Sequence, residues 1–122
     1  MRAIVVDDSR ATRAILRRIL SGLGFEVVEA ADGREGIAVL TETGGVGLAL
    51  VDWNMPVMDG LAFIRAVRSD PANDGLVIMM VTTEGDVDHM ITALEAGANE
   101  YAMKPFTASV IREKLELLGV AS

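Results

Sequence analysis

Carboxylate, hydroxyl and amine side chains follow the short apolar runs of the sequence. Asp7 and Asp8 come directly after the first run, and Asp52 comes directly after the third. A threonine pair follows the fourth run and a lysine follows the fifth: Thr82, Thr83 and Lys104. In open sheets of parallel strands, ligands bind outside the carboxyl ends of the strands. The pattern therefore predicts one site that gathers three carboxylates, a hydroxyl group and a lysine.

Three neighbouring carboxylates repel one another and need a counter-charge. The chain has no cysteine and one histidine, so the ligands would be oxygen atoms, which favours Mg²⁺, Mn²⁺ or Ca²⁺. Three carboxylates are few for a Ca²⁺ site, whereas Mg²⁺ keeps water ligands and shares a phosphate oxygen. A carboxylate can also attack phosphorus, with a lysine and a hydroxyl group balancing the phosphoryl charge. The residues indicate Mg²⁺-assisted phosphoryl transfer onto an Asp, with Mn²⁺ as the second choice of metal.

Each of these residues, taken alone, has an ordinary structural explanation. An Asp that follows a strand commonly caps the next helix, which suits Asp7 or Asp8. Asp52 fits this explanation less well, because residues 54–56 delay the next helix. Lys104 alone would be a solvated surface residue. The coincidence at four strand ends favours the functional interpretation.

Alternating strand and helix patterns predict how the chain positions these residues. Apolar runs occur at residues 3–6, 25–28, 48–51 and 76–81, with a weaker run at 98–103. Segments with helical periodicity follow them and are expected to begin near Ser9, Asp32, Asp59, Gly85 and Thr107. Such (βα)₅ alternation predicts an α/β fold, a doubly wound parallel sheet with helices on both faces. The common flavodoxin-like strand order 2-1-3-4-5 would bring strands one and three together.

Helical periodicity also predicts which side chains are buried. One face of the first helix is expected to carry Ile15, Leu16, Ile19, Leu20 and Leu23, and the opposite face Arg10, Arg13, Arg17 and Arg18. One face of the last helix is expected to carry Val110, Ile111, Leu115 and Leu118. His89 lies in the fourth helical segment without a His or Cys partner, so we expect a solvated side chain.

The composition narrows the class of protein. The 122 residues match the usual size of one domain, and 51% hydrophobic residues are enough for a core. A formal charge of −7 argues against binding to nucleic acid or anionic membranes. The first apolar run is too short for a signal peptide, and no run reaches the roughly 20 residues of a membrane span. We therefore expect a single domain over residues 1–122. We also expect the protein to be cytoplasmic and monomeric.

Five motifs follow one another at the expected strand ends. They are Val5–Ser9 (VVDDS), Asp52–Gly60 (DWNMPVMDG), Val81–Thr82, Gly97–Ala98 and Lys104–Thr107 (KPFT). In this order they strongly resemble the receiver domain of two-component response regulators, over nearly the whole chain. The likeness is greatest to the chemotaxis branch of that family.

The resemblance implies a role for each residue of the site. Asp52 would be the phosphoacceptor, and Lys104 would pair with a phosphoryl oxygen. Asp8, Asp52 and the main-chain carbonyl of Asn54 would bind Mg²⁺ directly, and Asp7 would act through a metal-bound water. The family also implies a cis peptide bond between Lys104 and Pro105.

Further residues would tune the reaction or transmit it. By resemblance, Thr82 would move to hydrogen-bond the phosphoryl group, and Tyr101 would swing inward behind it. Asn54, Thr83 and Glu84 would modulate the reaction rates, with Thr83 larger than the residue usual in the family. A surface of the fourth helix, fifth strand and fifth helix, here called the target surface, would bind the partner: Gly85, Met90, Leu94, Tyr101, Met103 and Lys114.

The family also implies the partners of the chain. A histidine kinase would donate the phosphate, a target such as the flagellar switch would bind the phosphorylated form, and a phosphatase would be a further partner. We expect a phosphoacceptor rather than a classical enzyme, without an output domain.

A phosphorelay intermediate that passes its phosphate to another His protein is the alternative. A hydrolase of the haloacid-dehalogenase type is less consistent, because Ser9 stands where that family needs a second Asp. A flavin carrier and a Rossmann enzyme lack their phosphate-binding loops.

Overall fold

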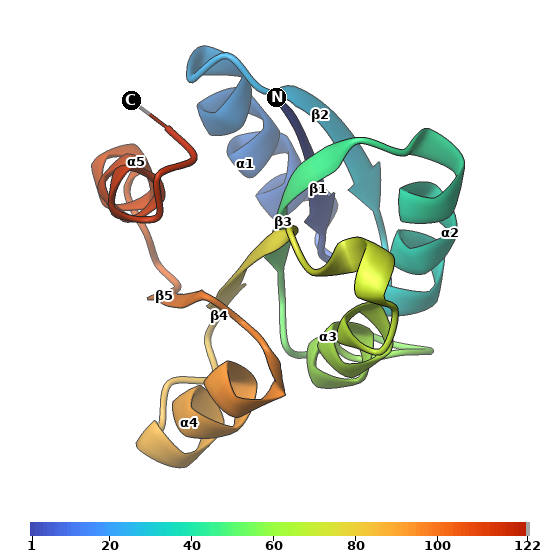
Figure 1. Cartoon of the computed structure of the whole chain (residues 1–122). Coiled ribbons are helices and arrows are strands. Elements are labelled where there is room, and N and C mark those ends of the chain that lie inside the picture. The colour runs from blue at the N-terminus through green and yellow to red at the C-terminus, as the bar shows by residue number, and fades with distance from the viewer. Residues whose placement is uncertain (122) are drawn as a thin grey trace.

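Five parallel strands form one sheet in the order β2-β1-β3-β4-β5 in the computed structural model, which describes residues 1–121 (Figure 1). The strands are β1 (Arg2–Val6), β2 (Glu26–Ala30), β3 (Val46–Val51), β4 (Val77–Thr82) and β5 (Glu100–Met103). Val6 is in register with Val51, and Thr82 is in register with Met103. The carboxyl ends of the strands therefore meet at one edge, and the predicted α/β fold and strand order are confirmed.

Helices cover both faces of this sheet. They are α1 (Arg10–Gly22), α2 (Gly33–Thr43), α3 (Gly60–Arg68), α4 (Val87–Ala96) and α5 (Ala108–Leu117), with a short 3₁₀ helix at Pro71–Asn73. Helices α1 and α5 pack on one face, and α2, α3 and α4 pack on the other (Figure 1). Among the helices of residues 1–121, none is long and apolar enough to cross a membrane.

Side-chain caps begin each of the five α-helices. The capping oxygens accept hydrogen bonds from main-chain N–H groups three residues further on and belong to Ser9, Asp32, Asp59, Asp86 and Thr107. The fourth helix begins later than the sequence analysis predicted, because Asp86 rather than an earlier residue caps it. Gly85 therefore lies in the β4–α4 loop.

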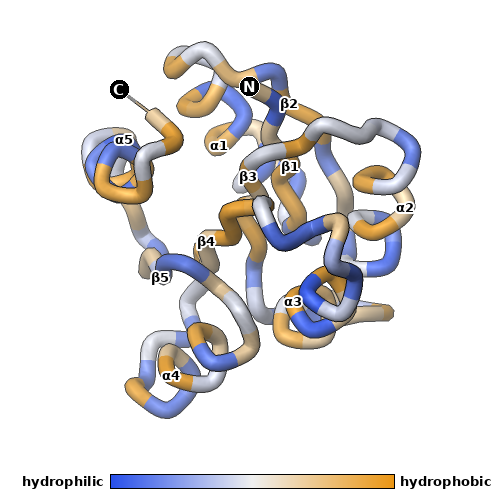
Figure 2. The backbone as a smooth tube through the Cα atoms, viewed as in Figure 1, coloured by the Kyte–Doolittle hydropathy of each residue, from blue (hydrophilic) through white to orange (hydrophobic). Residues whose placement is uncertain are grey.

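The central strands β1, β3 and β4 are buried on both faces, and Figure 2 shows apolar residues along the strands with polar segments on the outer helices. Two predictions of buried side chains are wrong: Ile15 is 53% exposed and Val110 is 39% exposed. Each lies at the margin of the apolar face of its helix, and only the residues at the centre of that face are buried against the sheet. Arg13, expected on a solvated face, is half-buried and hydrogen-bonds Glu29 and the Asp7 carbonyl oxygen, at 3.1 and 2.6 Å.

Candidate functional site

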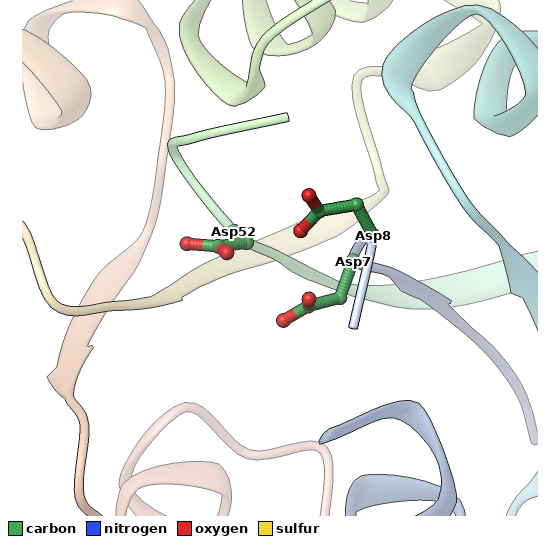
Figure 3. A group of neighbouring side chains, drawn as sticks. All are labelled: Asp7, Asp8 and Asp52. Atoms are coloured by element: carbon green, nitrogen blue, oxygen red, sulfur yellow. The ribbon is translucent and has the colours of Figure 1, made fainter. Parts of the chain in front are cut away.

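Three carboxylates meet where the neighbouring strands β1 and β3 end. Asp7 and Asp8 follow β1, and Asp52 follows β3. The three side chains lie close together, and one carboxylate oxygen of each lies within 4.8 Å of the others (Figure 3). Main-chain hydrogen bonds fix the spacing, because the Asp52 N–H donates to the Val6 carbonyl at 3.0 Å. The predicted convergence of these residues is therefore present in the structure.

The three carboxylates differ in their surroundings. Asp7 and Asp52 are only 1% and 8% exposed, whereas Asp8 is exposed. Asp7 Oδ1 accepts a hydrogen bond from the Ser9 N–H at 2.8 Å. Burial nevertheless raises the pKa of the Asp7 carboxyl, since loss of water outweighs this hydrogen bond and the nearby lysine. None of the three carboxylates caps α1, because Ser9 does so.

Lys104 supplies the positive charge of the cluster. Its Nζ lies 3.0 Å from Asp7 Oδ2 and 3.2 Å from Asp52 Oδ2. Burial disfavours the charged amine, but the hydrogen bond to Asp7 and the negative charges of Asp52 and Asp7 outweigh it, so the pKa of Lys104 is raised. The Lys104 N–H donates to the Thr82 carbonyl at 2.9 Å, and the peptide bond to Pro105 is cis, as predicted.

The main chain of Glu84 connects Thr82 with Tyr101. The Glu84 N–H donates to Thr82 Oγ1 at 3.3 Å, and the Tyr101 hydroxyl donates to the Glu84 carbonyl oxygen. Thr82 is fully buried and Tyr101 is 7% exposed, so the tyrosine ring is inward in this structure. Burial, together with the charges of Glu84, Asp86 and Asp52, raises the pKa of Tyr101 to about 12.

Two loops meet beside the carboxylates. Asn54 Nδ2 donates to Glu84 Oε1 at 2.7 Å, which joins the β3–α3 and β4–α4 loops. Thr83 is exposed in the second loop. Beneath the first loop, Gly60 packs so closely that a Cβ atom there would lie 2.2 Å from the Asp52 carbonyl oxygen. The site thus depends on the last glycine of the Asp52–Gly60 motif, for which the sequence alone predicts no contact with Asp52.

His89 is a feature of the site that sequence reasoning missed. It was expected to be solvated, but its side chain is half-buried and its ring packs edge-on against Trp53, with ring centroids 4.8 Å apart. Its Nδ1 lies 2.5 Å from Asp86 Oδ2. Sequence spacing holds no signal for this contact, because it joins the β3–α3 loop to α4, which only the folded sheet brings together.

The residues of the target surface lie beside β5, with different exposures. Leu94 and Met103 are 47% and 39% exposed, while Met90 is half-buried and packs against the core. The Met103 side chain covers Gly85, where a Cβ atom would lie 2.2 Å from the methionine Cε. Lys114 Nζ lies 3.5 Å from a carboxylate oxygen of Glu100.

The donor set of the cluster fits a hard divalent cation. One oxygen from each of three carboxylates can face a common point, and the exposed Asp8 leaves that point open to solvent. Mg²⁺ prefers such a site, because it binds through a few carboxylates and retains water ligands. A cation there would also relieve the repulsion that Lys104 alone balances.

Comparison with known proteins places this geometry in a family. The model of the response regulator receiver domain matches residues 3–116. The chain belongs to this family. The resemblance found in the sequence is therefore confirmed, and the chain is a signalling receiver domain rather than a classical enzyme.

Individual relatives point to the CheY-like members of the family. The chain is 45% identical to a chemotaxis protein CheY homolog of Campylobacter jejuni, over all of this chain and 95% of that protein. It is also 45% identical to the chemotaxis protein CheY1 of Helicobacter pylori, over 97% and 96% of the two chains. Among solved structures, CheY4 of Vibrio cholerae superposes with a TM-score of 0.89 at 33% identity, covering 95% and 96% of the chains. This receiver domain is therefore CheY-like along its length.

Proposed function

We propose that this receiver domain is a phosphorylation-controlled regulator that accepts a phosphoryl group on Asp52. The observation that carries the proposal is the position of the Asp52 carboxylate between two aspartates and the Lys104 amine. Asp52 is 8% exposed, so a small opening remains for a donor.

In the proposed reaction, an Asp52 carboxylate oxygen attacks the phosphorus of a phosphohistidine. The new O–P bond forms as the P–N bond breaks, and the imidazole nitrogen leaves and takes up a proton from solvent. Lys104 lies near enough to Asp52 to pair with a phosphoryl oxygen as the charge builds. Asp7, Asp8, Asp52 and the Asn54 carbonyl would hold Mg²⁺, which supplies charge neutralisation for the phosphoryl oxygens when bound.

Three residues around the site are proposed to set its rates. Asn54 and Glu84 hydrogen-bond each other at the mouth of the site, and Thr83 lies exposed next to Glu84. Donors and water must pass these side chains to reach Asp52. Their size and polarity would therefore govern how fast the phosphate is gained and lost.

The phosphoryl group would act on the target surface through Thr82. Movement of the Thr82 hydroxyl toward the phosphate would break its hydrogen bond with the Glu84 N–H. The carbonyl oxygen of the same Glu84 accepts a hydrogen bond from the Tyr101 hydroxyl. A change in the β4–α4 loop would then change the positions of the Tyr101 and Met103 side chains on the target surface. Such a switch is a population shift, limited by how much better the target binds one state than the other.

We infer a role in chemotaxis, with a histidine kinase as donor, the flagellar switch as target, a phosphatase as a further partner and the cytoplasm as the location. The support is the 45% identity to proteins named as chemotaxis proteins over nearly their whole length. A phosphorelay role uses the same site chemistry and is the second candidate.

Labelling with acetyl phosphate tests the reaction, and peptide binding tests the target. The protein should incorporate an acid-labile, hydroxylamine-sensitive phosphate in the presence of Mg²⁺ and none in EDTA. With beryllofluoride as the phosphate mimic, a peptide from a flagellar switch protein should bind several-fold more tightly. Equal binding with and without the mimic, together with transfer of the phosphate to a second His protein, would favour the relay role.

A further inference from the structure

His89, the single histidine of the chain, packs against the residue that follows Asp52. Its ring meets the Trp53 ring edge-on, with centroids 4.8 Å apart and planes at 86°. Trp53 belongs to the β3–α3 loop, whereas His89 belongs to the first turn of α4. The contact therefore joins the loop that carries Asp52 directly to α4.

Asp86 fixes the position of the His89 ring relative to α4. One oxygen of this capping carboxylate accepts from the His89 main-chain N–H at 2.8 Å. The other lies 2.5 Å from His89 Nδ1. Because the same carboxylate binds the main chain and the ring, the ring cannot move far without disturbing the start of the helix. The His89 main-chain N–H and ring also lower the pKa of Asp86, which favours the ionised cap.

Glu84, in the β4–α4 loop, provides a second connection between the β3–α3 loop and His89. Its Oε1 accepts from Asn54, and its Oε2 lies 3.8 Å from His89 Nδ1. The ionisable groups that face the His89 ring are thus Glu84 and Asp86, while the uncharged Trp53 faces it from the β3–α3 loop. His89 lies at the centre of this group of side chains, all of which are at least partly exposed.

We propose that His89 is a positioning residue that couples the state of Asp52 to α4 through the contact of its ring with Trp53. The inference rests on the proposed function, in which Asp52 carries the phosphoryl group. If the β3–α3 loop shifts, the Trp53 ring moves, and His89 must follow it or lose a packed contact. Because His89 lies in the first turn of α4, a displacement of its ring moves the start of that helix directly. This route is separate from the hydrogen bonds that connect Thr82 with Tyr101.

Binding coupling is reciprocal, so a target that holds α4 in one position should in turn favour one state of the β3–α3 loop. The same contact would then let a bound target change how firmly Asp52 and its neighbours hold a phosphoryl group.

Three variants separate the ring contact from other roles of the residue. His89→Ala removes the ring, whereas His89→Phe keeps a ring edge for Trp53 and loses only the ring's contact with Asp86, since the main-chain N–H still donates to that carboxylate. Glu95→Gln changes an exposed side chain of the same helix and serves as the matched control. The probe is beryllofluoride with Mg²⁺, and fluorine NMR measures how much of it is bound. Nitrogen-15 NMR then measures how far the main-chain amide signals of Met90 and Leu94 move on binding.

At equal occupancy, His89→Ala should lose more than half of the α4 signal movement seen in the parent protein. His89→Phe and Glu95→Gln should keep most of it. Full movement in His89→Ala, or equal loss in His89→Phe and His89→Ala, would overturn the inference. If His89→Ala does not fold, His89→Gln takes its place, because it lacks the ring but can still hydrogen-bond Asp86. Absence of bound beryllofluoride in the parent would instead overturn the proposed function, and this inference with it.

Discussion

Lys104 Nζ lies 3.2 Å from Asp52 Oδ2, although the two residues are 52 positions apart in the chain. The ends of β3 and β5 bring them together, with β4 between these strands. The amine also contacts Asp7 at 3.0 Å, so one positive charge serves two buried carboxylates. With Asp8 the cluster holds three carboxylates and one amine, so an excess of negative charge remains that a bound cation would neutralise.

Replacement of the lysine should strengthen metal binding. In Lys104→Met the positive charge that repels a second cation is gone, so the affinity for Mg²⁺ should rise by roughly threefold to tenfold. Quenching of Trp53 fluorescence during a Mg²⁺ titration would measure the change. Lys114→Met, which removes a lysine paired with Glu100 instead, should leave the affinity nearly unchanged. Weaker binding in Lys104→Met would show that the metal does not bind beside this amine.

Asp7→Asn should stabilise the metal-free protein by about 1 kcal/mol, because burial disfavours the Asp7 carboxylate. The raised pKa of Asp7 means that the folded protein binds this proton more tightly than the unfolded chain does. The protonated Asp7 carboxyl therefore stabilises the fold at pH values below its ordinary pKa of 3.8. This stabilisation is lost as the pH rises through the raised pKa of the folded state. The gain from Asp7→Asn should be largest at neutral pH and should vanish in acid. Urea unfolding with EDTA at several pH values would measure it, and a constant gain would contradict the explanation.

The sequence predicts the position of a site residue well where a chemically reactive side chain directly follows a strand. Asp7 and Asp52 end apolar runs that are buried on both faces, so their positions follow from the strand pattern once the strand order is assumed. That order came from the family, because periodicity alone does not say which strands are neighbours.

The parts that the sequence did not predict are contacts between elements. Ile15 has the spacing of a core residue, but it lies at the edge of the buried face of α1 and is exposed. The sequence predicts solvated side chains for Arg13 and His89, because their partners Glu29 and Trp53 lie on other elements. Side-chain pairs of this kind depend on how helices are placed on the sheet, which helical periodicity does not encode.

Gly60→Ala should destabilise the fold and the site together. A Cβ atom would lie 2.2 Å from the Asp52 carbonyl oxygen, so the main chain must move, at a cost of about 2 kcal/mol or more. Gly22→Ala is the matched control, because a Cβ atom there meets nothing within 4 Å, and its stability should be equal or slightly higher. Thermal unfolding of both variants would measure the difference. Equal melting temperatures would contradict the close packing beneath Asp52.

Tyr101 should remain uncharged at pH values that ionise an ordinary tyrosine. Its pKa is raised to about 12, and it is the only tyrosine, so absorbance at alkaline pH reports on it alone. Because the folded state favours the neutral phenol, this contribution to stability is present below the ordinary tyrosine pKa of 10.0 and is lost as the pH rises toward about 12. Phenolate appearing near pH 10 while far-ultraviolet circular dichroism stays native would show that the ring is solvated.

Direct identification of the phosphorylated residue tests the central claim. After reaction with acetyl phosphate and Mg²⁺, borohydride reduction converts an aspartyl phosphate into homoserine, which peptide mass spectrometry locates. The account predicts homoserine at position 52 in the parent protein and no such product in Asp52→Asn. The control variant Asp59→Asn alters the exposed cap of α3 and should be modified to the same extent as the parent. Homoserine at another position in the parent, or an unchanged yield in Asp52→Asn, would contradict it.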